Sequence, residues 1–129
     1  MSGSVLVDSN LVIAHLRGDP PLTARLQGAN TVQLLWVVLG ELYYGAYKST
    51  QPDRIILQVR KFLRGCVLLL PDEATTQHYG RIKADLRRAG TPVPENDIWI
   101  AATARRFDLP LATRDQHFAF ISGLALLAW

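Results

Sequence analysis

The sequence predicts an α/β fold with a mainly parallel central sheet and helices on both of its faces, an α/β/α sandwich. Short apolar segments alternate along the chain with longer segments of helical periodicity. The short segments are apolar throughout, as expected for strands that are buried on both faces. The 129 residues include 49% hydrophobic ones and no linker-like segment, so we expect a single domain with one core.

The first half of the chain contains two predicted strands and four predicted helices. The strands are residues 4–7 and 31–35, and the helices are residues 11–17, 22–27, 37–48 and 52–64. The segment Gly-Asp-Pro-Pro at 18–21 is expected to separate the first two helices, because Gly and Pro interrupt regular structure. Pro52 suits the first turn of the fourth helix, and Gly65 ends it.

The second half continues the alternation of strand and helix. The expected strands are residues 66–70, 109–113 and 124–128, the expected helices are residues 72–89 and 97–107, and residues 117–120 form a turn of helix. Gly90 is a suitable stop for the helix before it. Residues 91–96 are the clearest loop. The helix at 97–107 is apolar on most sides, so we expect it to be largely buried.

The cysteine content and the apolar runs exclude several classes of protein. The one cysteine, Cys66, cannot form an intrachain disulfide or a cysteine-rich zinc site, and it is expected to be a small core residue. No apolar run approaches the roughly 20 residues that span a bilayer. No secretory signal is visible at the N-terminus. We therefore expect a soluble, cytoplasmic protein without a membrane partner.

Four carboxylates lie where a lone charge is unfavourable: Asp8, Glu41, Asp97 and Asp115. Asp8 and Asp115 each follow a predicted strand. Asp97 opens a buried helix, and Glu41 interrupts an apolar stretch, which makes it the hardest to explain as structure. Sites in parallel α/β sheets form beyond the carboxyl ends of the strands, so all four are expected to converge there. Clustered carboxylates usually hold a hard divalent cation such as Mg²⁺ or Mn²⁺, which can activate water toward a phosphodiester.

Three of these acids also have a structural interpretation. Asp8 and Asp97 could cap the helices that follow them. Asp115 could be a turn residue that pairs with Arg114 or His117. It is improbable that such interpretations hold for all four acids at once.

Other residues give weaker signals. His15, His78 and His117 show no metal-ligand spacing and are expected to have structural or surface roles. Gly-rich phosphate loops, nucleophile elbows and His-Glu zinc motifs are absent from the sequence. The tyrosines within residues 43–47 are expected to pack in the core or an interface, although one ring could stack on a base.

The charge distribution suits a polyanionic substrate. The net charge is +3, from 14 basic and 11 acidic residues, and without the four acids above it is +7. A basic surface around an acidic pocket would attract RNA broadly. The alternative is ordinary solubility charge.

Four segments in this order resemble the PIN-domain ribonucleases, specifically the VapC toxins of bacterial VapBC toxin–antitoxin modules. They are VDSNLVI at 7–13, LGELYYGA at 39–46, PENDIWIAA at 94–102 and ATRDQHF at 112–118, and the ending at 124–129 is also similar. The resemblance implies a single PIN-like nuclease domain over residues 1–129. It also implies catalytic and metal-binding roles for Asp8, Glu41, Asp97 and Asp115, and supporting roles for Asn10, Asn96 and Thr113.

The activity implied by the resemblance is Mg²⁺- or Mn²⁺-dependent endoribonuclease cleavage that leaves 3′-hydroxyl and 5′-phosphate ends. The implied partners are a VapB-like antitoxin whose tail covers the site and a second copy in a homodimer. One departure concerns residues 34–38, which are apolar here, whereas many members have Ser or Thr shortly before the second acid. A hydroxyl cap of that helix is therefore not expected, and Trp36 is expected to pack in the core, with base stacking as the alternative.

Two other functions fit the same pattern. One is a PIN nuclease of RNA maturation or decay, and the other is a non-catalytic RNA-binding or interaction module with a relict acidic pocket. A phosphotransfer receiver domain is disfavoured, because it needs paired early acids and Asp8 has no adjacent acid.

Overall fold

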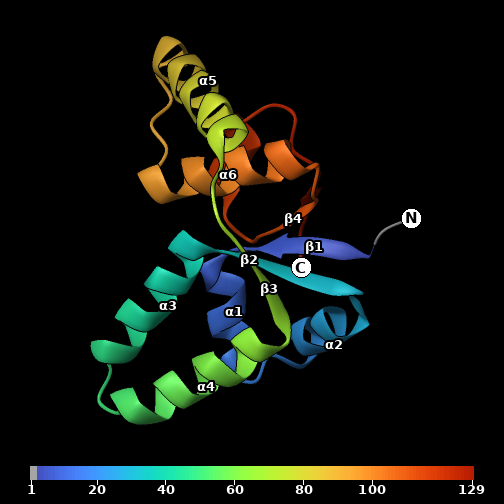
Figure 1. Cartoon of the computed structure of the whole chain (residues 1–129), viewed down its shortest axis with the longest axis vertical. Helices are drawn as coiled ribbons and strands as arrows, with labels where there is room; N and C mark the ends of the chain where they lie inside the picture. Colours follow the sequence, from blue (N-terminus) through green and yellow to red (C-terminus); the bar gives the residue numbers. More distant parts are fainter. Residues whose placement is uncertain (1–2) are drawn as a thin grey trace.

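A five-stranded parallel sheet forms the centre of the molecule (Figure 1). The structure is a computed structural model that describes residues 3–129. In spatial order the strands are β3 (Cys66–Leu69), β2 (Thr31–Leu35), β1 (Ser4–Val7), β4 (Leu111–Ala112) and β5 (Leu126–Leu127). All neighbouring strands are parallel, so their carboxyl ends share one edge.

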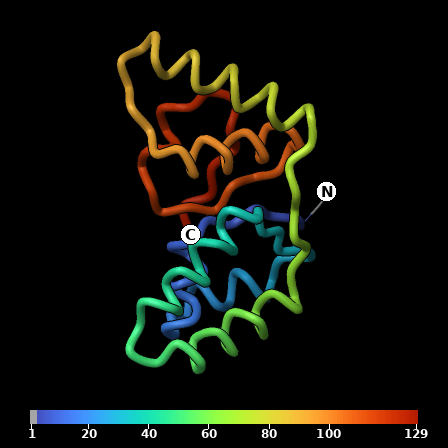
Figure 2. The backbone as a smooth tube through the Cα atoms, turned by 60° about the vertical axis from the view of Figure 1, so that its left-hand side comes forward, coloured from blue at the N-terminus to red at the C-terminus, as the bar shows by residue number. Residues whose placement is uncertain are grey.

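Helices cover both faces of this sheet, as Figures 1 and 2 show. They are α1 (Ser9–Leu16), α2 (Pro20–Gly28), α3 (Trp36–Tyr47), α4 (Pro52–Arg64), α5 (Glu73–Ala89), α6 (Glu95–Phe107) and the 3-10 turn η1 (Gln116–Phe120). Helices α1 to α4 lie on one side of the sheet, and α5 and α6 lie on the other. The connection from β3 to α5 crosses between the two layers. The predicted fold class is confirmed.

The central strands are buried on both faces, as their apolar composition predicts. Val5, Leu6 and Val7 of β1 are at most 2% exposed, and Leu34 of β2 is fully buried. These side chains belong to one hydrophobic cluster that also contains Phe118 of η1. Between residues 3 and 129, no helix is long and apolar enough to cross a bilayer.

Four helices, α1, α2, α3 and α6, begin one or two residues earlier than the sequence predicts. Helix α2 begins at Pro20, inside the predicted break, because Asp19 caps it by accepting a hydrogen bond from the backbone N–H of Leu22 at 3.2 Å. Helix α6 begins at Glu95 and not at residue 97. Asp97 therefore lies in its first turn, and the interpretation of Asp97 as a helix cap is wrong.

Trp36 was expected in the core and the tyrosines in the core or an interface, and three of these four side chains are exposed. Trp36 is 39% exposed, Tyr44 is 67% exposed and Tyr47 is 66% exposed, whereas Tyr43 packs against the core. Cys66 is half-buried, and its thiol donates to the backbone carbonyl of Phe62 at 3.3 Å. Helical periodicity predicted an apolar helix at residues 37–48 but did not show which face of α3 is exposed to solvent.

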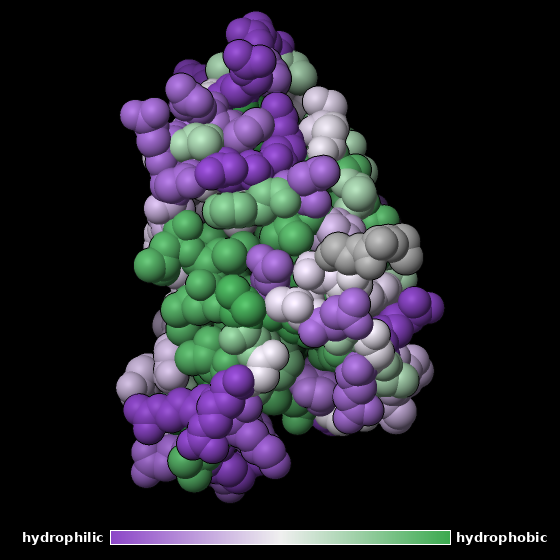
Figure 3. Space-filling model, turned by 45° about the vertical axis from the view of Figure 1, so that its right-hand side comes forward, coloured by the Kyte–Doolittle hydropathy of each residue, from purple (hydrophilic) through white to green (hydrophobic). Residues whose placement is uncertain are grey.

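Apolar surface is also exposed at the outer strand of the sheet. Val67 and Leu68 of β3, with Leu70 after it, are 41–64% exposed. Figure 3 shows an apolar area at mid-height of the molecule, where β3 lies between the hydrophilic surfaces of the two helical layers.

Candidate active site

The four predicted acids come together at the carboxyl edge of the sheet. Asp8 directly follows β1, Asp115 follows β4, Glu41 lies in the second turn of α3, and Asp97 lies in the first turn of α6. All four line an open pocket of about 400 Å³. The other lining residues are Ser9, Asn10, Pro94, Glu95 and Asn96. Segments that are far apart in the sequence thus supply one pocket.

Asp8 is the most deeply buried of the four, with 4% of its surface exposed. Its Oδ1 accepts a hydrogen bond from the backbone N–H of Leu11 at 3.2 Å, and its Oδ2 accepts one from the hydroxyl of Thr113. Burial raises the pKa of Asp8, and the charge of Asp115 adds to this, although the hydrogen bonds from Thr113 and from the backbone of Leu11 and Asn10 oppose it. Asp8 therefore caps α1 and lines the pocket at the same time.

Glu41 is half-buried between α1 and α6. Burial raises its pKa, and the charge of Asp8 raises it further. The side chains of Ser9 and Asn96 donate hydrogen bonds to its carboxylate and oppose this shift. Asn96, predicted as a supporting residue, thus contacts Glu41. Ser9 was not predicted as a site residue, because in the sequence it stands next to the more prominent Asp8.

The carboxylates of Asp97 and Asp115 both approach the same ring nitrogen of His117. Nδ1 of His117 is 3.1 Å from Oδ1 of Asp115 and 3.5 Å from Oδ2 of Asp97. Burial raises the pKa of Asp97 to about 6, and the charge of Asp115 adds to it, while the hydrogen bond with His117 opposes it and the charge of Glu41 adds a smaller contribution.

His117 was expected to have a structural or surface role, and the structure places it, although exposed, at the acidic pocket. One side-chain ligand atom from each of Asp97, Asp115 and His117 lies within 4.8 Å of the others. The pairing of Asp115 with His117 that the sequence allowed is present, whereas Arg114 pairs with Asp19 at 3.1 Å. The sequence signal for this pairing was that His117 follows Asp115 by two residues. At this spacing the carboxylate of Asp115 also accepts a hydrogen bond from the backbone N–H of His117.

The two other supporting residues have different positions. Thr113 is 5% exposed and lies behind Asp8, and its hydroxyl also accepts the backbone N–H of Asp115 at 2.9 Å. It therefore connects the acids of two adjacent strands. Asn10 lines the pocket and donates through its backbone to Asp8.

The electrostatics of the pocket suit a divalent cation. Burial and mutual repulsion raise the pKa of Asp8, Glu41 and Asp97 together, and His117 opposes the shift of Asp97 alone. A cation would remove this conflict. The donor set consists mostly of carboxylate oxygens with one imidazole, which favours a hard ion over a thiolate-binding one.

Comparison with known proteins identifies related chains. Residues 5–124 match the family model described as PIN domain. The chain is 36% identical over 127 residues to "Ribonuclease VapC2" of Haemophilus influenzae and 32% identical over 127 residues to "tRNA(fMet)-specific endonuclease VapC" of Shigella flexneri, with 96% of each chain covered in both cases.

Solved structures of similar chains have the same fold. VapBC from Salmonella typhimurium bound to DNA matches with a TM-score of 0.89 and 31% identity, over 98% of each chain. VapBC2 from Rickettsia felis, bound to a promoter fragment, matches with a TM-score of 0.92 and 24% identity over 98% of each chain, which shows the fold alone. On its family match and its relatives, the chain belongs to the PIN-domain family and, within it, to the VapC ribonucleases.

Proposed function

We propose that this protein cleaves RNA internally as the toxin of a toxin–antitoxin pair, and that residues 1–129 act as one nuclease domain. The observation that carries the proposal is the convergence of four carboxylates from four segments on one open pocket. The relatives named as ribonuclease and tRNA(fMet)-specific endonuclease support RNA as the substrate. The products would be a 3′-hydroxyl and a 5′-phosphate.

The proposed cofactor is Mg²⁺ or Mn²⁺, held by Asp8, Glu41, Asp97 and Asp115. When bound, such an ion supplies positive charge to the scissile phosphate and makes water more acidic. The protein's own contribution is to orient the acids. Hydrogen bonds to Asp8 and Glu41 hold these side chains in place before substrate arrives. Preorganised charges of this kind avoid a cost of reorganisation during the reaction.

The basic surface would hold the RNA backbone beside the pocket. A neighbouring hollow of about 340 Å³ is lined by Lys83 and Arg87 of α5 and shares Glu95 with the acidic pocket. Lys83 already pairs with Glu95 at 3.2 Å, whereas no ion pair within residues 3–129 involves Arg87. Arg87 is therefore the better placed of the two to contact a phosphate.

A VapB-like antitoxin is the proposed protein partner, and the cytoplasm is the proposed location. The solved VapBC complexes among the structural neighbours support the partner. A homodimer is also proposed. Co-purification with the product of an adjacent small reading frame, and the sedimentation mass alone and in complex, test these assignments.

The activity is tested with purified protein and single-stranded RNA. We expect cleavage with Mg²⁺ or Mn²⁺, loss of cleavage with EDTA, and loss of cleavage in Asp8→Asn and Asp97→Asn. The exposed Asp53→Asn is the matched control and should remain active. Unchanged cleavage by Asp8→Asn or Asp97→Asn would show that the site is assigned wrongly. RNA binding without cleavage by the wild type would favour the non-catalytic alternative, and cleavage without growth arrest on expression would favour RNA maturation or decay.

A further inference from the structure

A second hollow, with aromatic walls, adjoins the acidic pocket. Its volume is about 440 Å³. Trp36, Val37, Gly40 and Tyr44 of α3 line it, and it shares Glu41 and Asn96 with the acidic pocket. We call this hollow the aromatic groove. The two hollows therefore adjoin at Glu41 and Asn96, and a ligand in the acidic pocket can extend toward the groove.

The aromatic groove has the shape of a stacking site. Trp36, Gly40 and Tyr44 recur every four residues and so lie along one face of α3. Gly40 leaves the space between the two rings open, since a Cβ added there would meet no atom within 4 Å. Nζ of Lys48 lies 5.0 Å from the centre of the Tyr44 ring, which places a positive charge at the far end of the groove.

We propose that the aromatic groove binds an unpaired base of single-stranded RNA, next to the phosphodiester that the acidic pocket cleaves. This inference rests on the proposed function. Every base has a flat π-face that stacks on aromatic rings, and stacking does not require a particular sequence. The adjacent acidic pocket and the cation at Lys48 match a ligand that carries both flat rings and phosphates.

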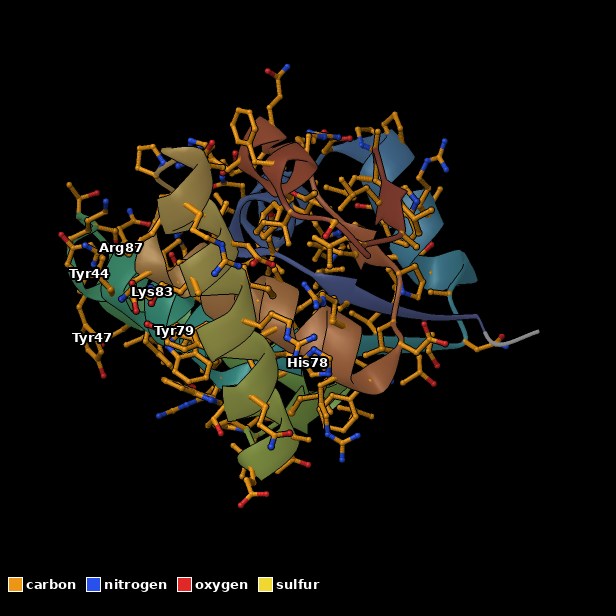
Figure 4. All side chains as sticks on the ribbon, turned by 90° about the horizontal axis from the view of Figure 1, so that it is seen from above. Tyr44, Tyr47, His78, Tyr79, Lys83 and Arg87 are labelled. Carbon is orange, nitrogen blue, oxygen red and sulfur yellow. The ribbon has the colours of Figure 1, made fainter. Side chains whose placement is uncertain are left out.

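The hollow lined by Lys83 and Arg87 also adjoins the acidic pocket, through Glu95. Figure 4 shows Tyr44 of α3 on the same side of the molecule as Lys83 and Arg87 of α5. The acidic pocket shares lining residues with both hollows. A strand with one base in the aromatic groove can therefore place one phosphate at the acids and a nearby phosphate at Arg87.

The test measures cleavage of a short RNA with one mapped site, using Tyr44→Ala and Trp36→Ala. We expect KM to rise about tenfold in each, with kcat changed much less, because one stacked base is lost. Trp36→Phe keeps a flat ring and should retain most of the affinity. Tyr47→Ala is the matched control, since Tyr47 is equally exposed on the same helix but does not line the groove.

The second arm uses RNA in which one flanking nucleotide at a time is abasic. At the nucleotide that enters the groove, removal of the base should raise KM for the wild type but not further for Tyr44→Ala. An equal KM in the wild type and both alanine variants would overturn the inference. It would also be overturned if Tyr44→Ala still raised KM relative to the wild type on every abasic RNA. Because Trp36 is less exposed than Tyr44, circular dichroism checks its variants, and Tyr44 carries the test if Trp36→Ala does not fold.

A failure of the proposed function is distinguishable from a failure of this inference. If the wild type does not cleave RNA, the proposed function fails, and fluorescence anisotropy with the same RNAs still measures whether Trp36 and Tyr44 contribute to binding. If these variants instead change the sedimentation mass or weaken the complex with the antitoxin, with RNA affinity unchanged, the groove is a protein interface and the inference is wrong.

Discussion

Neutralising Asp97 should stabilise the metal-free protein while it abolishes activity. Its carboxylate lies 17% exposed between two other acids, and its pKa is raised from 3.8 to about 6. A shift of about two units, at about 1.4 kcal/mol each, corresponds to roughly 3 kcal/mol of unfavourable free energy when the group is ionised. Asp97→Asn keeps the size of the side chain without the charge, so we expect a gain of about 1–3 kcal/mol in the free energy of unfolding at neutral pH.

The pH dependence gives this prediction a definite sign. Below about pH 4 the carboxyl is protonated in the folded and the unfolded state, and the substitution should have little effect. Between about pH 4 and 6 the unfolded state releases the proton that the folded state still holds, so the stability of the wild type falls as pH rises. Above about pH 6 the full difference between variant and wild type is present.

The assay is urea denaturation with EDTA at about pH 4 and about pH 7.5, with Asp53→Asn as the exposed control. Added Mn²⁺ should then stabilise the wild type, because a ligand that binds only the folded state raises its stability, and should stabilise Asp97→Asn less. A variant that is less stable than the wild type at pH 7.5 without metal would refute the reasoning. Such a result would mean that Asp97 already has a compensating partner in the protein.

Substitutions at four further positions test other parts of the structure. Thr113→Val removes the hydroxyl that donates to Asp8, so it should lower stability by about 1–2 kcal/mol and RNA cleavage by about tenfold or more, both restored in Thr113→Ser. Asp72→Ala removes the capping box of α5 and an ion pair with α6; it should lower the melting temperature without changing cleavage. Because that ion pair holds the pKa of Asp72 well below its ordinary value, this difference in melting temperature should be present at neutral pH and shrink as pH falls below about 4. Gly90→Ala should cost about 1 kcal/mol at a φ of 68°, whereas Gly80→Ala inside α5 should stabilise by about 0.5–1 kcal/mol, both measured by thermal melting.

The sequence predicted the parts of the fold that depend on local pattern. The apolar segment 4–7 is the central strand, and the turn at Gly90 adopts the left-handed conformation that its residue type favours. Strands β4 and β5 are only two residues long, shorter than their apolar segments, because strand length depends on pairing with a neighbour. The convergence of the acids followed from the rule that parallel strands end at a common edge.

What the sequence could not give was the direction of individual side chains. Trp36 and Tyr44 stand at helical spacing in an apolar helix, and only the packing of α3 shows that their shared face is turned to solvent. His117 contacts two acids because η1, which Asp115 caps, turns the ring back toward Asp97 of α6. Both features depend on contacts between elements, to which local periodicity is insensitive.

The start of α3 connects these observations. Leu35 is the N-cap residue and makes no side-chain capping bond, as the apolar stretch predicted, and Trp36 occupies the first helical position. By contrast Asp8 caps α1 while it lines the pocket, so its capping bond fixes a functional carboxylate. A side chain at the start of a helix can therefore serve the helix and the site together, or the site alone. In α3 the cap position is occupied by Leu35, whose burial in the core offsets the missing cap, worth about 1 kcal/mol, and the adjacent Trp36 is left to line the groove beside Glu41.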